Sequence, residues 1–330
     1  MQKVNPKKCV QVVRDIFHFF KKKAFHFQEP KKLLHPTRDV LCVGLCSQQS
    51  IIASGLEDGR IFLWEMSSGQ FLKELVGGHR DKVTGVSFNR DATIMISVGQ
   101  EGAMNLWDLT DLNRVLRRKL VGHDGASLTC CQVSPNSCLI ATGGKDCDVM
   151  VWGNVGRPVC GRLRGHSNWV ASVAFDPNSN VLASGGYDCA VCLWNCLTFT
   201  LIRTIRHHES PVKCVAFSAD ASLIGSGDTE GKVLVMRVSD GACLRSLHGH
   251  VEEVTGIAFL EGAGAIVSVS LDSSLKVWAL RGRCLNSFRA HDGGCLAVFV
   301  SPQDSVMVTC GDDYCANIFP FGFDDKDAVE

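Results

Sequence analysis

The sequence predicts an all-β protein, and within that class a seven-bladed β-propeller whose blades are four-stranded antiparallel sheets. Short alternating apolar runs, such as "VASVAF" and "VLASGG", are separated by turns rich in Gly, Asp, Asn and Ser. Such runs are typical of antiparallel strands. Four runs make one unit, and seven units follow one another along the chain. Regular repetition of a four-strand unit is the sequence signature of a propeller.

The fourth unit shows what each repeat contains, and it holds the three residue types of a hydrolase triad. His166 stands 28 residues before Trp194, Ser184 stands ten before it and Asp188 stands six before it. The first strand follows the His, the second strand contains the Ser, the next turn carries the acid, and the third strand ends near the Trp. An enzyme needs only one exposed triad. Recurrence of the same set in every unit would therefore indicate a structural role and not a catalytic one.

The set recurs in all seven units, and its histidines are spaced 41 to 44 residues apart. Four units keep all four residue types: His35, Ser54, Asp58 and Trp64; His123, Thr142, Asp146 and Trp152; His166, Ser184, Asp188 and Trp194; His250, Ser268, Asp272 and Trp278. Three units are degenerate: His79, Ser97, Glu101 and Trp107 have Glu as the acid; His208, Ser226 and Glu230 end in Met236; His291, Thr309 and Asp313 end in Phe319.

The recurring set resembles the WD-repeat family over about residues 24–320, although only Trp107 is followed by Asp. The resemblance implies that each set is a buried relay, in which the acid holds the His, the His meets the hydroxyl, and the hydroxyl accepts from the indole N–H. Such a relay satisfies polar groups that would each cost about 1–3 kcal/mol if buried without a partner. Seven buried relays are scaffolding, so the sequence predicts that the protein is not an enzyme.

The ends of the chain differ in charge from the repeats and define three predicted regions. Residues 1–38 hold ten Lys or Arg and two Asp or Glu. We expect a basic N-terminal extension over 1–23, the propeller over 24–320 and a short acidic tail over 321–330. The seventh unit lacks an outer strand after Phe319, so we expect part of "AFHFQEPKKLL" to supply it. Pro30 favours an edge position there, because an edge tolerates a missing N–H.

The N-terminal extension contains a candidate amphipathic element. Val10, Val13, Phe17 and Phe20 fall on one helical face, and Lys21–Lys23 follow. The alternatives are a helix or strand packed on the side of the propeller, an amphipathic element that binds a partner or a membrane surface, and a disordered leader.

Composition argues against several other classes. No apolar run approaches the roughly 18 residues of a membrane span, and the N-terminus lacks a secretory signal pattern. The 17 cysteines are scattered through strand-like runs, which favours free thiols in a cytoplasmic protein; the three lysines leave a nuclear location open. Cys189 and Cys192 form one C-x-x-C without a second pair, so we expect no metal and no cofactor.

We expect the binding surface to be the top face, which the resemblance assigns to the loops after each His and the residues before each acid. Trp169 and Tyr187 fall at these positions in the fourth unit, and either cap the blade or anchor a partner. Other residues at the same registration are Arg80, Lys82, Lys145, Glu253 and Asp312. This mixture of charges argues against simple nucleic-acid binding, which favours a basic stripe.

These observations predict a non-catalytic scaffold that binds proteins or peptides on its top face within a multiprotein complex. Two alternatives are a substrate receptor of a ubiquitin ligase and an RNA- or chromatin-associated module that uses the basic N-terminus. A substrate receptor would be expected to contain a Trp-Asp-x-Arg motif after a third strand or a C-terminal adaptor-binding box, and neither pattern is present in the sequence.

Overall fold

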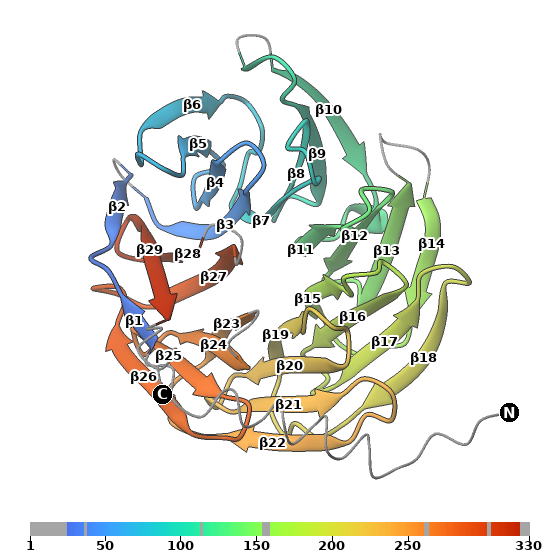
Figure 1. Cartoon of the computed structure of the whole chain (residues 1–330). Helices are drawn as coiled ribbons and strands as arrows, with labels where there is room; N and C mark the ends of the chain where they lie inside the picture. Colours follow the sequence, from blue (N-terminus) through green and yellow to red (C-terminus); the bar gives the residue numbers. More distant parts are fainter. Residues whose placement is uncertain are drawn as a thin grey trace, which may run out of the picture.

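The computed structural model describes residues 25–35, 38–112, 115–153, 159–260, 264–301 and 305–323. In these residues the chain forms seven antiparallel sheets, which are arranged as blades around a common centre (Figure 1). Residues of the innermost strands line a channel there. The predicted all-β, seven-bladed propeller is confirmed. The extension predicted over 1–23, including the candidate amphipathic run, lies outside the described residues, as does the tail from residue 324 onward.

Each of the first six blades takes its four strands from one repeat, in order from the channel to the outside. Blade 1 consists of β3 (Val40–Cys46), β4 (Ile51–Leu56), β5 (Ile61–Glu65) and β6 (Phe71–Leu75); blade 2 of β7 (Val83–Phe88), β8 (Ile94–Gly99), β9 (Ala103–Asp108) and β10 (Leu116–Val121); blade 3 of β11 (Leu128–Val133), β12 (Leu139–Gly144), β13 (Asp148–Gly153) and β14 (Val159–Arg164). Blade 4 consists of β15 (Val170–Phe175), β16 (Val181–Gly186), β17 (Val191–Asn195) and β18 (Thr200–Ile205); blade 5 of β19 (Val212–Phe217), β20 (Leu223–Asp228), β21 (Val233–Arg237) and β22 (Cys243–Leu247); blade 6 of β23 (Val254–Leu260), β24 (Ala265–Ser270), β25 (Ser274–Ala279) and β26 (Cys284–Arg289).

Blade 7 closes the ring with strands from both ends of the described chain. Its inner strands are β27 (Cys295–Ser301), β28 (Val306–Gly311) and β29 (Cys315–Phe323), and β1 (Phe25–Phe27) and β2 (Lys31–Leu34) both pair with β29. Lys31 lies opposite Ile318 and Leu34 opposite Cys315. The closing strand therefore comes from the predicted segment. β29 continues past the expected end of the propeller at 320 and pairs with β1 as far as Phe323.

The core lies between neighbouring blades, which explains why middle strands such as β4, β5, β16 and β17 are almost entirely buried. Leu33 of β2 is 1% exposed and packs with Val40 and Ile52 of blade 1. This contact joins the last blade to the first. The outer strands are the exception, since most of β18 is exposed. Each blade is thus covered on both faces by its neighbours and is exposed along its outer strand.

Half of the cysteines in the described ranges are buried and serve as small apolar side chains. Cys42 and Cys214 are free thiols on innermost strands, and burial raises the pKa of each to about 12. In the C-x-x-C, Cys189 donates to the Glu209 carbonyl and Cys192 lies beside the Thr204 hydroxyl, so the two thiols have separate contacts. Across the described ranges no three His, Cys, Asp or Glu side chains converge as metal ligands do. No helix there has the length and apolarity to cross a membrane.

Candidate functional site

The relay of blade 4 is assembled as the repeat pattern predicts. His166 Nδ1 lies 2.9 Å from Asp188, and its Nε2 lies 2.7 Å from Ser184 Oγ. The Trp194 indole N–H donates to the same Oγ at 2.8 Å. Because Nδ1 faces a carboxylate, it carries the proton, and Nε2 accepts from the Ser hydroxyl. The four side chains therefore form one directed chain of hydrogen bonds.

Two glycines in blade 4 make room for this relay. A Cβ on Gly165 would lie 2.7 Å from the Trp194 ring, and one on Gly186 would lie 2.7 Å from His166 Nδ1. Both distances are far below van der Waals contact. The Gly before the His and the Gly two residues after the Ser are therefore fixed by packing around the imidazole and the indole.

The same chain of hydrogen bonds is present in blades 2, 3 and 6, and without an indole in blade 7. The His–acid and His–hydroxyl pairs are His79 with Glu101 at 2.6 Å and Ser97 at 2.7 Å; His123 with Asp146 and Thr142, both at 2.8 Å; His250 with Asp272 at 3.0 Å and Ser268 at 2.7 Å; His291 with Asp313 at 2.9 Å and Thr309 at 2.7 Å. The indole donors are Trp107, Trp152 and Trp278.

Blade 1 departs from the prediction, because Asp58 is not part of its relay. His35 Nδ1 donates to the Leu33 carbonyl at 3.1 Å, while its Nε2 meets Ser54, which also accepts from Trp64. Asp58 instead forms an ion pair with Arg60, at 2.7 Å. A cation two residues away in the same turn competes successfully for the carboxylate, and a backbone carbonyl takes its place beside the His.

Blade 5 also departs from the prediction, because its acid is Asp228 and not Glu230. His208 Nδ1 lies 2.7 Å from Asp228 and Nε2 lies 2.6 Å from Ser226. Asp228 is 1% exposed and also accepts the backbone N–H groups of Glu230 and Lys232. The acid at the end of β20 therefore replaces the one two residues later, and Met236 occupies the place of the indole.

Burial and hydrogen bonding shift the pKa of several relay groups. Burial lowers the pKa of His79, His250 and His291, and this outweighs the acid beside each. For Asp188 burial opposes ionisation, yet hydrogen bonds from the Ser167 N–H and from His166 leave its pKa below the ordinary value. The imidazoles of His79, His250 and His291 are thus neutral, and Asp188 is a carboxylate. The Ser and Thr hydroxyls are 0% exposed, so a substrate cannot reach them in this conformation, and the relay serves as an internal brace.

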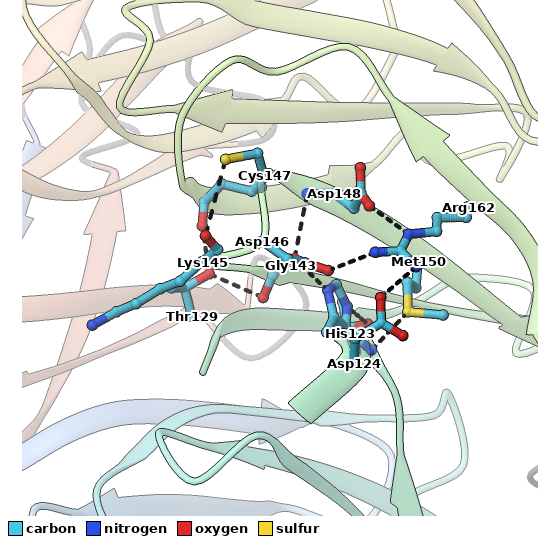
Figure 2. A network of polar contacts seen from close by, with 12 residues as sticks. His123, Asp124, Thr129, Gly143, Lys145, Asp146, Cys147, Asp148, Met150 and Arg162 are labelled. Atoms are coloured by element: carbon cyan, nitrogen blue, oxygen red, sulfur yellow. Dashed lines mark hydrogen bonds and ion pairs between the residues drawn. The ribbon is translucent and has the colours of Figure 1, made fainter. Parts of the chain in front are cut away.

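Blade 3 adds a second brace around its relay acid, shown in Figure 2. Arg162 of β14 reaches Asp146 at 3.3 Å and Asp124 at 2.8 Å, and it also pairs with Asp148. These contacts, chiefly the hydrogen bonds to Asp124 and Asp148, raise the pKa of the guanidinium above its ordinary range. One outer-strand side chain therefore connects three carboxylates of blade 3 and holds the loop that precedes β11.

The top face is formed by the loops before each innermost strand and the turns that carry the acids. A backbone hydrogen bond joins each turn to its loop, and we call the two residues that it joins a rim pair. The seven pairs are Glu57–Asp39, Gln100–Lys82, Lys145–Ser127, Tyr187–Trp169, Thr229–Pro211, Leu271–Glu253 and Asp312–Gly294, at 2.8–3.2 Å. The backbone is therefore equivalent in all seven blades, and only the side chains differ.

The rim pair of blade 4 is aromatic and partly open. The rings of Trp169 and Tyr187 meet edge to face with centroids 5.5 Å apart, and Trp169 is 40% exposed. The Lys145 ammonium lies 4.5 Å from the Trp169 ring centroid. Three of the residues predicted for partner binding are therefore brought together across blades 3 and 4.

Lys213 is a further member of this cluster that the sequence analysis missed. It lies on β19, 5.2 Å over the Tyr187 ring, donates to the Tyr187 hydroxyl at 3.0 Å, and pairs with Glu253 at 2.6 Å. Burial alone would lower the pKa of Lys213, but these hydrogen bonds raise it. Alignment of the seven units would have shown a lysine where blades 2 and 6 have Thr. We call Lys145, Trp169, Tyr187, Lys213 and Glu253 the aromatic corner.

The other two predicted residues lie apart from the aromatic corner, on blade 2. Lys82 forms an ion pair with Glu57 of blade 1 at 2.9 Å, and Arg80 is exposed. On the same side of the ring, burial and the carboxylates of Glu57 and Asp312 raise the pKa of Asp39. The top face thus has an aromatic pair flanked by Lys145 and Lys213 over blades 3–5, and it carries Asp39 and Asp312 over blades 7 and 1.

A cavity of about 570 Å³ lies where β1 and β2 meet blade 6, lined by Phe27, Phe288 and Phe319 among others. Asn317 also lines it, and the buried Asn317 Oδ1 has no hydrogen-bond partner among the described residues. The equivalent oxygen of Asn105 in blade 2 is unpaired in the same way. The unpaired oxygen therefore recurs with the repeat and does not indicate a ligand.

Comparison with known proteins agrees with this geometry. The WD domain, G-beta repeat family matches residues 28–65, 69–108, 114–153, 157–195, 199–235, 241–279 and 282–319. These matches cover most of the sequence and follow the seven blades. The chain belongs to the WD domain, G-beta repeat family, whose propellers are typically non-catalytic protein-interaction scaffolds that act in complexes.

Individual relatives are distant. The chain is 28% identical over 139 residues to a guanine nucleotide-binding protein subunit beta-like protein of Encephalitozoon cuniculi, covering 39% of this chain and 40% of that protein. It is 27% identical over 152 residues to the nuclear distribution protein PAC1-2 of Uncinocarpus reesii (40% and 32%), and 27% identical over 141 residues to the bovine pre-mRNA-processing factor 19 (42% and 27%). The chain thus matches two-fifths or less of each relative.

Proposed function

We propose that this protein is a non-catalytic scaffold that binds a protein or peptide partner on its top face, anchored at Trp169 and Tyr187. The aromatic corner is the observation that supports this proposal. Large side chains with a polar tip, placed in a well-packed setting, dominate the free energy of most protein interfaces. The blade 4 rim pair is the aromatic one among the seven, and lysines from the adjoining blades 3 and 5 hold its rings in place.

The packing around the pair gives it the rigidity that an anchor needs. Tyr187 is fixed by its backbone bond to Trp169 and by its hydroxyl contact with Lys213. Little side-chain entropy is therefore lost when a partner binds. Lys145 and Glu253 supply the polar edge of the corner, where charge changes act mainly on the association rate.

Affinity purification of the intact chain beside a Trp169→Ala/Tyr187→Ala double variant tests the proposal. Asp39→Ala is the matched control, because Asp39 occupies the rim position equivalent to Trp169. We expect at least one partner to be lost from the double variant and kept by the control. Recovery of identical partner sets from all three proteins would refute top-face anchoring at blade 4.

The same purification separates the two alternative roles. An RNA- or chromatin-associated module would lose its partners on nuclease treatment and at raised salt, because phosphate contacts depend strongly on ionic strength. A substrate receptor would retain ubiquitin-ligase subunits in the double variant while it loses the substrate. The cytoplasmic location expected from the sequence stays a prediction, which imaging of a tagged chain would check.

A further inference from the structure

The two lysines that flank the aromatic rim pair differ in how their charges are balanced. Lys213 has a carboxylate partner, Glu253, at 2.6 Å, and only 24% of its side chain is exposed. Lys145 contacts the Trp169 ring at 4.5 Å, and no residue within the described ranges forms an ion pair with it. One side of the corner is therefore electrostatically complete, and the other carries an uncompensated positive charge.

The acids closest to Lys145 in sequence are already engaged elsewhere. Asp146 accepts from His123 and pairs with Arg162, and Asp148 pairs with Arg162 as well. In Figure 2 the Lys145 side chain extends away from this cluster. Its backbone N–H is held by the Ser127 carbonyl at 2.9 Å. The ammonium is thus directed to the exposed indole and not to the carboxylates of its own blade.

A cation on an aromatic face still has room for an anion. The ring quadrupole attracts the ammonium but leaves its charge unneutralised, and a carboxylate can add a charge-assisted hydrogen bond to the same Nζ. The neighbouring 40% exposed Trp169 offers apolar area directly beside this point. The corner therefore combines one anion-accepting group with one apolar surface.

We propose that Lys145 and Trp169 together accept an acidic peptide segment of the partner, in which an Asp or Glu lies next to an apolar or aromatic side chain. The carboxylate binds Lys145 Nζ, and the apolar side chain packs on Trp169 and Tyr187. This inference rests on the proposed function, since it names the chemistry of the segment that the top face binds.

The remaining charges on the face favour one orientation of that segment. Asp39 and Asp312 lie on the opposite side of the ring, where burial and the neighbouring carboxylates raise the pKa of Asp39, while Glu57 beside them pairs with Lys82. An acidic segment is repelled there and attracted at blade 3. The segment is therefore expected to place its acidic end over blade 3.

Selection from a displayed library of random peptides on the intact chain tests the inference. We expect the wild-type chain to enrich peptides with Asp or Glu beside Phe, Trp or Leu. Lys145→Glu should weaken these peptides at least tenfold and shift the enriched residue to Lys or Arg, and Lys145→Gln should weaken them without that shift. Arg245→Glu is the matched control, because Arg245 is an exposed cation on the outer strand β22, away from the face.

Each other outcome has a defined meaning. Trp169-dependent peptides without an acidic preference, or an acidic preference that survives Lys145→Glu, would overturn the inference and leave the proposed function standing. Peptides that bind independently of Trp169 would overturn both. If no peptide is enriched and an oligonucleotide binds in a way that depends on Lys145, the inferred peptide ligand is overturned in favour of nucleic acid. Unchanged melting of both Lys145 variants shows that each change acts on binding.

Discussion

Blade 4 and blade 1 have the same four-stranded sheet and the same rim hydrogen bond, but they differ inside and on top. In blade 4 a buried carboxylate, Asp188, holds His166. In blade 1 the Leu33 carbonyl holds His35, and Asp58 pairs with Arg60. The relay therefore requires a buried acceptor for the imidazole Nδ1–H, and a backbone carbonyl meets that requirement as well as an acid does.

On the top face the two blades differ in another way: the backbone is the same and the side chains change. Blade 4 presents Trp169 and Tyr187, and blade 1 presents Asp39 and Glu57 at the equivalent positions. A side chain that faces solvent at a fixed backbone position is free to vary without cost to the fold. Differences at the rim thus indicate function, and differences in the relay indicate only how a brace is built.

The largest effect is expected at the seam beside blade 1. A chain that starts at His35 lacks β1 and β2, so β29 loses its outer partner and Leu33 no longer packs on blade 1. We expect aggregation or loss of cooperative unfolding, because the ring then has an open sheet edge. Deletion of residues 1–9 keeps both strands and should be nearly silent in a thermal melt. Cooperative melting of the shorter chain at the wild-type temperature would refute the closure.

Acidification should weaken blade 1 next. Burial lowers the pKa of His35 to about 4, while the unfolded chain titrates near 6.5. The stabilisation is complete above pH 6.5 and is lost as the pH falls toward 4, because only the unfolded chain then takes up the proton. The full loss is roughly 3 kcal/mol for His35, and His79, His250 and His291 act in the same direction. Urea denaturation at pH 7.5 and 5 measures the part of this loss that falls above pH 5, about 2 kcal/mol for His35. Equal unfolding free energies would contradict a neutral buried imidazole.

Removing the acid should destabilise the protein more in blade 4 than in blade 1. Asp188→Ala leaves the Nδ1–H of buried His166 unpaired, which costs about 2–3 kcal/mol. Asp58→Ala removes a partly exposed ion pair with Arg60, which is worth less than about 1 kcal/mol. Denaturant titration of the two variants gives the difference. A larger loss in Asp58→Ala would show that the carboxylate belongs to the blade 1 relay after all.

Most of the fold could be predicted from the sequence, because the repeat places its strands, turns and relay residues at constant offsets. The predictions of Asp58 and Glu230 as relay acids were wrong for local reasons, which a constant offset along the sequence cannot show. Arg60 competes for Asp58 within one turn, and Asp228 reaches His208 from a position two residues before the expected one. Lys213 was missed because its contacts with Tyr187 and Glu253 connect three different blades. Such contacts depend on how repeats pack, and no single repeat encodes them.

The central claim is that blade 4 braces the fold with its relay and binds a partner with its rim, and one paired measurement tests it most directly. Melting and partner binding are recorded on the same Asp188→Ala and Trp169→Ala proteins. Asp188→Ala should melt lower and, at low temperature, still bind the partner. Trp169→Ala should melt nearly as the wild type and lose about 2 kcal/mol or more of binding free energy. A large drop in the melting of Trp169→Ala with unchanged binding would make Trp169 a packing residue and contradict the account.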